Sequence, residues 1–337
     1  MEHRIIGGKN PAGPKREAPA TPAATPQVQM LQVDEDSDGQ RLDNYLLRRL
    51  KGVPKTHVYR VIRSGEVRVN KGRASADTRV GTGDLIRVPP VRLPAPTTAA
   101  EPEAGSAPPR EFPLLFEDEH LLVIDKPAGT AVHGGSGVSF GVIEQLRRAR
   151  PQARFLELVH RLDRDTSGVL LLAKKRSALI NLQEQFRARE TGKVYAVLVA
   201  GAWPDALKVI DEPLYKYLDA GGERRVRVTS KADENGRRSI TLIKVVRNFK
   251  DYTLLDVTIK TGRTHQIRVH LAHAGHPIVG DDKYGDFALN KAVARERRFD
   301  RMFLHARQLA FDHPATGARI ELRAALPPEC DNLLKVL

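Results

Sequence analysis

The chain has 337 residues, and its 41% hydrophobic content is enough for one sizeable catalytic core and a small satellite domain. Its 55 Lys and Arg against 41 Asp and Glu give a formal charge of +14, which favours nucleic acid or an anionic membrane surface as partner. The single cysteine, Cys330, excludes an internal disulfide, and neither a signal peptide nor an apolar run of about 18 residues is present. We therefore expect a cytoplasmic protein with no membrane partner.

Two stretches rich in proline and alanine divide the chain. Residues 1–30 contain five prolines and few large apolar side chains, which predicts a disordered tail. A similar composition at 91–111 predicts an extended linker. These stretches leave a small domain at 31–90 and a large one at 112–337.

The small domain is basic, because residues 41–90 hold twelve Lys and Arg against four Asp and Glu. Apolar spacing predicts a helix in RLDNYLLRRL and another in THVYRVIRSG, with Thr56 as N-cap and Gly65 just past the end of the second. VRVN, a turn at Lys71-Gly72 and DLIRVP predict short strands. A basic cluster beside this turn predicts a phosphate-binding surface, made of Arg60, Arg63, Arg68, Lys71 and Arg73.

RLDNYL, VYRVIRSGEVRVN and GDLIRVP resemble the S4 RNA-binding domain over the whole of 41–90. The resemblance implies that Arg60, Arg63 and Lys71 are presented to structured RNA. We include Arg41 and Lys55 in the same predicted set of RNA contacts.

Strand patterns dominate the large domain. Strands are predicted in HLLVIDKPAG, LELVH, SGVLLLAKK and KVYAVLVAG, and hairpins in SITLIKVVRNF with YTLLDVTIKTG and in QLAFDHPATGARIEL. Helices are predicted in SFGVIEQLRRAR, SALINLQEQFRAR and HQIRVHLAHAG. The expected fold class is α+β, with a mainly antiparallel mixed sheet in the large domain and a small N-terminal α/β domain.

A dense charge cluster lies between apolar segments in LVHRLDRDTSGVLLLA, residues 158–173. A carboxylate on such a turn is a nucleophile, a general base or a structural anchor. The cations Arg161 and Arg164 favour ionised carboxylates. Asp165, followed by Thr-Ser-Gly, is typical of a turn, which leaves Asp163 as the candidate for chemistry, although the residues alone do not decide between the two aspartates.

The segment KTGRTHQIRVHLAHAGHPIVGDDKYG contains four histidines, His265, His270, His273 and His276. Their spacing is not H-E-x-x-H and no cysteine accompanies them, so we expect no metal site. Thr264 is the predicted N-cap of the helix that starts near His265.

Arginine is the stronger signal in this segment. Arg263 and Arg268 bracket the start of the predicted helix, where a guanidinium can bind a carboxylate or a phosphate. Pairing of Arg263 with Asp163 would place both charges in one cleft, and the alternative for Arg268 is a surface phosphate contact or a plain surface charge. Lys193 and Tyr195, two apart on a predicted strand, share a face. Tyr195 is either a core residue or an aromatic platform for a base.

HRLDRDTSG, the Lys193-Val194-Tyr195 triplet, GRTHQIRVH and HPIVGDDKYG resemble the RluA superfamily of pseudouridine synthases over roughly 113–325. The resemblance is strongest to members that modify 23S ribosomal RNA of the large subunit. It implies that Asp163 is catalytic, Tyr195 stacks on the target uracil and Arg263 pairs with the aspartate. It also implies that Arg161 holds the flipped position open and that Ile267 lines the pocket.

The implied reaction breaks the N1–C1′ bond of uridine and forms a C5–C1′ bond, so it needs no redox cofactor and the cleft must exclude water. Asp163 would attack C1′ or C6, or remove a proton from C2′, and the sequence leaves these open. The expected partner is 23S ribosomal RNA or its precursor, read by a monomer that requires no protein partner. The alternatives are an RNA-binding factor with an inactive core and a metal-dependent RNA hydrolase that uses the histidines.

Overall fold

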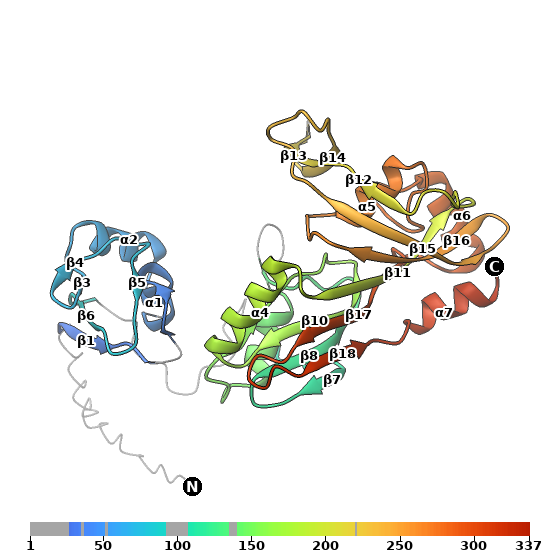
Figure 1. Cartoon of the computed structure of the whole chain (residues 1–337). Helices are drawn as coiled ribbons and strands as arrows, with labels where there is room; N and C mark the ends of the chain where they lie inside the picture. Colours follow the sequence, from blue (N-terminus) through green and yellow to red (C-terminus); the bar gives the residue numbers. More distant parts are fainter. Residues whose placement is uncertain (1–26, 35–36, 51–52, 92–106, 135–139, 220) are drawn as a thin grey trace, which may run out of the picture. The chain divides into compact units, whose positions relative to one another are not determined.

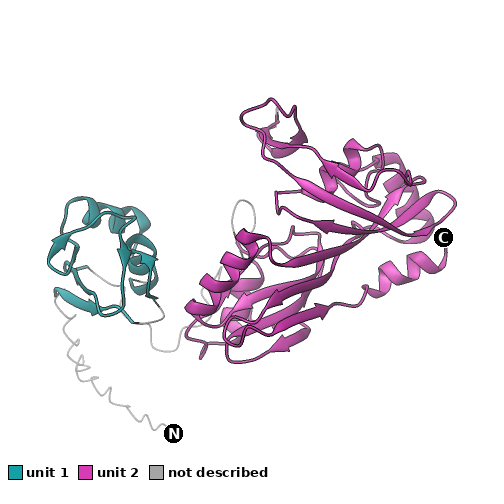
Figure 2. Cartoon of the chain, in the orientation of Figure 1, with its two compact units in different colours: residues 1–96 teal, residues 97–337 magenta. Residues whose placement is uncertain are grey.

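The structure is a computed structural model that describes residues 27–34, 37–50, 53–91, 107–134, 140–219 and 221–337. The chain forms two compact units, residues 1–96 and 97–337 (Figure 2). Most of the predicted tail at 1–30 and of the predicted linker at 91–111 lies outside the described residues. Gln29 and Met30 already belong to a strand, so regular structure begins before the predicted boundary at residue 30.

Unit 1 is built from short elements around one apolar core (Figure 1). They are β1 (Gln29–Gln32), β2 (Gln40–Arg41), α1 (Leu42–Arg49), α2 (Lys55–Arg63), β3 (Arg68–Val69), β4 (Gly72–Arg73), β5 (Arg79–Val80) and β6 (Leu85–Val88). One sheet has the order β1-β6-β3-β4, and β2 pairs with β5. Leu46 of α1, Val58 of α2 and Ile86 of β6 are fully buried, which shows how the helices close over the sheet.

Both predicted helices of unit 1 are present, with differences at their ends. Helix α2 starts at Lys55 after Pro54, so Thr56 lies inside the first turn and is not the N-cap. The tight turn between β3 and β4 falls on Asn70 and Lys71, which both have positive φ. It is displaced by one residue from the predicted Lys71-Gly72 turn.

Unit 2 contains a large sheet with helices on its faces (Figure 1). The elements are β7 (Leu114–Glu117), β8 (Leu121–Lys126), α3 (Val142–Ala149), β9 (Glu157–Leu158), β10 (Ser167–Ala173), α4 (Arg176–Ala188), β11 (Gly192–Ala200), β12 (Val209–Asp211), β13 (Leu214–Leu218), β14 (Arg224–Val228), β15 (Ile240–Asn248), β16 (Tyr252–Ile259), α5 (Gln266–His273), α6 (Phe287–Arg297), β17 (Leu304–Asp312), β18 (Arg319–Arg323) and α7 (Pro328–Lys335).

The sheet of unit 2 follows the order β12-β15-β16-β11-β17-β10-β8-β7, with β18 added to β17 and β9 to β10, while β13 and β14 form a separate ribbon. Among the described strands, only β10 and β17 pair in parallel. This arrangement confirms the predicted α+β class and its mainly antiparallel mixed sheet. The segments of unit 2 that the sequence did not predict are β7, β12 to β14, α6 and α7.

Strand β10 lies between β17 and β8 in the sheet, and all seven of its residues are buried. Leu170 and Leu172 face a core shared with α3, whereas Val169 and Leu171 face a core shared with α4. Gly168, with φ of +112°, lies so close to β17 that a Cβ atom there would be 2.2 Å from the carbonyl oxygen of Ala306. The turn before β10 is therefore fixed against the sheet.

The structure shortens one predicted strand. Only Glu157 and Leu158 of LELVH pair with β10, and the chain then runs through residues 159–166 without regular structure. None of the helices in the described ranges is long and apolar enough to cross a membrane.

Candidate active site

A cavity of about 1010 Å³ opens in unit 2 beside the turn at residues 161–166 and the start of α5. Its lining includes the five residues that the sequence nominated for catalysis and substrate binding, Arg161, Asp163, Tyr195, Arg263 and Ile267. These positions come from a loop, strand β11 and the segment around α5. Folding thus brings residues that are far apart in the sequence to one concave surface.

The turn that carries Asp163 is held by backbone contacts. The amide of Thr166 donates to the carbonyl of Asp163 over 3.2 Å, which closes the turn. The fully buried Lys126 donates to the carbonyls of Arg164, Pro127 and Thr130 over 2.9, 2.8 and 2.8 Å. Lys126 therefore ties the Asp163 turn to the turn that follows β8.

Burial lowers the pKa of Lys126 to about 7, while the carboxylates of Asp165 and Asp163 act in the opposite direction. Three carbonyl acceptors match the three N–H donors of an ammonium group, so the geometry favours the protonated lysine. Asp165 itself pairs with Arg164 over 3.1 Å. This pair belongs to the turn, whereas Asp163 faces the cavity.

The cation beside Asp163 is Arg268. Its Nη1 lies 3.5 Å from Oδ2 of Asp163, and its Nε and Nη2 donate to the two oxygens of Asp281 over 2.8 and 2.7 Å. Arg268 is 4% exposed and Asp281 is fully buried, so the predicted surface role of Arg268 is wrong. Burial tends to raise the pKa of Asp281, but the hydrogen bonds and charge of Arg268 hold it below its ordinary value.

Arg263 lines the cavity without pairing with Asp163. The structure records ion pairs of Asp163 with Arg268 and His265 only, among the described residues, while Nε of Arg263 donates to the carbonyl of Arg238 over 3.4 Å. The expected Arg263–Asp163 pair is therefore replaced by Arg268. The reason is the start of α5, where His265 adopts φ of +54° and the helix begins at Gln266, so Thr264 is not its N-cap.

His265 and Tyr284 form a second contact to the aspartate. The amide of Val226 donates to the Tyr284 hydroxyl over 3.1 Å, and this hydroxyl is hydrogen-bonded to Nδ1 of His265 over 2.8 Å. Nε2 of His265 lies 4.0 Å from Oδ2 of Asp163. Burial lowers the pKa of His265, Asp163 opposes the shift and Arg268 adds to it, so the ring is neutral at pH 7.

Tyr195 and Ile267 form an apolar wall. Tyr195 is 9% exposed and belongs to the main core, yet it also lines the cavity. Tyr195 is thus a core residue at the cavity wall, and stacking on a base stays a prediction. Burial, with the charge of Asp163, raises the pKa of the Tyr195 hydroxyl above its ordinary value, so it stays neutral.

The rest of the lining is basic. Among the described residues, eight Lys and Arg side chains line the cavity with Asp163 as their single carboxylate; they are Arg161, Arg164, Arg187, Arg189, Lys193, Lys260, Arg263 and Arg268. Burial and the nearby Lys260 lower the pKa of Lys193. A wall of this charge attracts the phosphates of a polyanion.

The histidines of the α5 segment do not converge on a common point. His270 is bonded to the Thr241 hydroxyl and the Glu212 carbonyl, and His276 to the carbonyl of Ala200. Within the described ranges, the one group whose ligand atoms could meet at a metal ion lies elsewhere and contains none of them. These interactions give His270 and His276 a structural role.

Unit 1 carries the predicted RNA contacts. Lys55, Arg60 and Arg63 are exposed on α2, and Lys71 is exposed at the tip of the β3–β4 turn. Arg41 is also exposed, but its guanidinium pairs with the buried Asp43 over 2.8 Å, which also accepts from the Tyr59 hydroxyl. Arg41 thus has an ion-pair partner, whereas no ion pair is recorded among the described residues for Lys55, Arg63, Lys71 or Arg60, whose guanidinium lies 3.4 Å from Nε2 of His57.

Sequence reasoning missed Lys126, Tyr284 and Asp281, and misassigned Arg268. The signal for Asp281 is an acidic pair in GDDKYG that follows a helix with an arginine in its first turn. Lys126 gives no such signal, because a lysine at a strand end is ordinarily a surface residue.

Comparison with known proteins identifies the family. Residues 120–273 match the family described as RNA pseudouridylate synthase, and residues 40–86 match the S4 domain. The chain is 50% identical over 311 residues to Ribosomal large subunit pseudouridine synthase C of Haemophilus influenzae, which covers 92% of this chain and 95% of that protein. The protein of the same name from Yersinia pestis is 49% identical over 316 residues, covering 93% and 96%.

A solved structure supports the same assignment. Human RNA Pseudouridylate Synthase Domain Containing 4 is 28% identical, with a TM-score of 0.55, and covers 66% of this chain and 92% of that one. The chain belongs to the RluA family of RNA pseudouridine synthases and carries an S4 domain. It is therefore an isomerase that acts on RNA, and the resemblance predicted from HRLDRDTSG and GRTHQIRVH is confirmed.

Proposed function

We propose that this enzyme converts uridines of 23S ribosomal RNA to pseudouridine in the large ribosomal subunit. The names of its relatives, which are about half identical to it over nearly their whole length, support this substrate. Ribosomal RNA is made in the cytoplasm, where we place the protein. We assign it as a monomer that needs no protein partner, because every side chain given a role in the reaction comes from one chain.

Asp163 is the proposed catalytic residue. Its carboxylate is the single acid among the described residues that line a cavity of eight cations, and this observation carries the proposal. Attack at C1′ or C6, or proton removal from C2′, requires an ionised carboxylate in each case. Arg268 at 3.5 Å, itself fixed by Asp281, supplies a positive charge beside the carboxylate.

The apolar wall is the proposed site of the uracil. A target uridine must leave its helix before N1–C1′ can be reached, and the flipped ring then needs a surface to stack on. Tyr195 offers its ring and Ile267 an aliphatic contact inside the cavity. Arg161 and Arg263 are proposed to bind the flipped nucleotide and its phosphates, since both are exposed cations at the cavity.

Unit 1 is proposed to add RNA affinity to the catalytic unit. Arg60, Arg63, Lys55 and Lys71 are exposed on α2 and at the following turn, and Arg41 lies at the start of α1. Two tethered modules that bind one RNA bind it more tightly than either alone. The conversion is an isomerisation, so atoms and electrons balance without a redox cofactor.

The test uses two aspartates of the same turn. Asp163→Asn should abolish tritium release from RNA labelled at C5 of uridine, with RNA affinity retained. Asp165→Asn is the matched control and should keep at least about a tenth of the activity, since it loses only a partly exposed ion pair. Full activity of Asp163→Asn would contradict the assignment. Pseudouridine mapping of 23S ribosomal RNA with and without this gene tests the substrate, and an unchanged map would reject it.

A further inference from the structure

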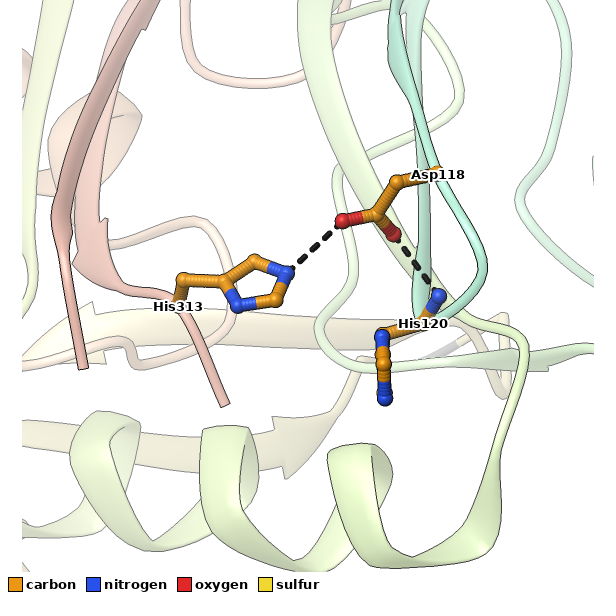
Figure 3. Close-up of side chains that lie close together, drawn as sticks. All are labelled: Asp118, His120 and His313. Atoms are coloured by element: carbon orange, nitrogen blue, oxygen red, sulfur yellow. Dashed lines mark hydrogen bonds and ion pairs between the residues drawn. The ribbon is translucent and has the colours of Figure 1, made fainter. Parts of the chain in front are cut away.

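A cluster of three potential metal ligands lies at the end of the sheet away from the cavity. Asp118 and His120 come from the turn between β7 and β8, and His313 from the turn between β17 and β18 (Figure 3). The pairing of Leu121 with Ala173 and of Lys126 with Gly168 puts this turn at the far end of β10 from Asp163. Those two ends are about 17 Å apart at about 3.4 Å per residue, so the cluster is separate from the active site.

The three side chains present their ligand atoms to one another. One carboxylate oxygen of Asp118 and one ring nitrogen from each of His120 and His313 lie within 4.8 Å of one another. Oδ1 of Asp118 accepts the backbone amides of His120 and Leu121, both over 2.7 Å, which orients Oδ2 toward Nε2 of His313 at 2.7 Å (Figure 3). The imidazole rings of His120 and His313 meet edge to face with their centres 5.5 Å apart.

These distances suit a small divalent cation. Metal–ligand bonds of about 2.0–2.2 Å at tetrahedral angles put the ligand atoms about 3.4 Å apart, so the cluster needs only small side-chain shifts to bind. Two imidazoles with one carboxylate are a set that Zn²⁺ and its neighbours in the first transition row bind well. The carboxylate of Asp118 is 30% exposed and leaves room for water as a fourth ligand.

The surroundings provide a second hydrogen-bonding shell. Thr316 Oγ1 lies 3.1 Å from Nδ1 of His313 and can accept a proton from it when Nε2 binds a metal. Without metal, the amides of Ala315 and Thr316 donate to Nδ1 over 3.3 and 3.2 Å, and Nε2 donates to Asp118. A metal on Nε2 requires the proton of His313 on Nδ1, so the amides of Ala315 and Thr316 would then have to give up Nδ1 as their acceptor. Nζ of Lys175 lies 3.4 Å from Nε2 of His120 and pairs with Glu119 over 2.5 Å, so a metal bound through this nitrogen has to displace the lysine from His120.

We propose that Asp118, His120 and His313 form a binding site for a divalent transition-metal ion, best suited to Zn²⁺, that joins the β7–β8 turn to the β17–β18 turn. The site is structural, because it lies away from the cavity and the metal takes no part in the isomerisation. The competing explanation is that Asp118 and His313 make a structural hydrogen bond alone. Under that explanation, His120 binds no metal.

The experiment measures metal bound by the full chain. Protein stripped with a chelator is dialysed against dilute ZnCl₂ and then against metal-free buffer, and zinc is counted by mass spectrometry. Wild type should retain one Zn²⁺ per chain, Co²⁺ should give the visible absorption bands of a tetrahedral site, and Zn²⁺ should raise Tm by several degrees.

Two variants decide whether the three residues hold the ion. His120→Asn and Asp118→Asn should each lose the retained zinc, the Co²⁺ bands and the Tm shift, with an unchanged circular dichroism spectrum as evidence of folding. His57→Asn, a histidine of unit 1 with no place in the cluster, is the control and should retain all three. No retained zinc in wild type, or equal retention in His120→Asn, would overturn the proposal and leave the hydrogen bond as the explanation.

Discussion

At the scale of single residues, the guanidinium of Arg268 connects Asp163 to the buried Asp281. Arg268 binds both oxygens of Asp281, reaches Asp163 with its third nitrogen and lies over the Tyr284 ring at 5.2 Å. A lysine has one compact charge and cannot make these contacts together. Loss of Arg268 would also leave the buried Asp281 without its partner, at a cost of about 3–5 kcal/mol.

A comparison of two arginines tests this geometry. Arg268→Lys should lower kcat by about a hundredfold, because the charge at Asp163 is no longer fixed, and should lower the free energy of unfolding as well. Arg263→Lys should keep kcat and the free energy of unfolding near wild type and change mainly KM, since its side chain is exposed and makes no ion pair with Asp163. Tritium-release kinetics and urea unfolding measure both. An equal loss of kcat in the two variants would show that the pair seen in the structure does not govern the reaction.

The candidate site shows what sequence can predict about residues. Asp163, Tyr195, Arg161, Arg263 and Ile267 were predicted to share a site, and all five line one cavity. The ion-pair partner of Asp163 was predicted wrongly, because the identity of that partner depends on the direction in which α5 leaves the loop. That direction is set by positive φ at His265, a histidine in a conformation that no residue pattern announces.

At the scale of elements, the parallel contact between β10 and β17 holds the Asp163 turn. Ser167 pairs with His305 in this contact, its hydroxyl lies 2.9 Å from Nδ1 of the histidine, and Arg301 donates to the same hydroxyl over 2.7 Å. Arg301 also pairs with Glu329 of α7 over 2.7 Å. Helix α7, which the sequence did not predict, is therefore linked through Arg301 to the strand that follows the Asp163 turn.

This contact should make stability depend on pH. Burial lowers the pKa of His305 to about 4, and Arg301 adds to this shift, so the folded chain keeps the ring neutral. As pH falls through 6.5, the unfolded chain binds a proton that the folded chain does not. The free energy of unfolding should therefore fall between pH 6.5 and pH 4, by up to about 3 kcal/mol from this residue.

Urea unfolding across this pH range tests the effect. His305→Asn keeps an acceptor for Ser167 but does not titrate, so its stability should vary less with pH than that of wild type. His57→Asn, which changes a half-buried histidine of unit 1, should keep the wild-type slope. If His305→Asn shows the full slope, the neutral histidine is not its source.

The elements that were predicted have clearer apolar patterns in the sequence than those that were missed. Strand β10 and the β15–β16 hairpin are long and regular, so their apolar patterns are read without ambiguity. Helix α6 has a single buried residue, Val293, and such a helix has no clear apolar face for periodicity to detect. Strand β14, RRVRV, carries three arginines in five residues and offers only two apolar side chains as a signal.

At the scale of the whole molecule, the basic charge is unevenly distributed along the chain. Over half of the net +14 lies within residues 41–90, although this segment is a small part of the sequence. Composition changes sharply around residue 96, where the chain divides into its two compact units. Exposure of Lys55, Arg60, Arg63 and Lys71 on unit 1 is consistent with an RNA-binding surface, and its contribution can be separated from catalysis.

The salt dependence of RNA binding provides that separation. Removing a cation that neutralises one phosphate reduces the slope of log affinity against log salt by about 0.7–0.9. The triple variant Arg60→Ser, Arg63→Ser, Lys71→Ser should therefore reduce this slope by about 2–3. KM should rise steeply while kcat at saturating RNA stays near wild type, because the cavity in unit 2 is untouched. A second triple variant is the control, because it has the same loss of net charge. It replaces three basic residues of α6 by Ser: Lys291, Arg295 and Arg297. An equal change of slope in both triple variants would mean that unit 1 contributes only general charge, whereas a selective change would establish its surface as the part that holds the RNA.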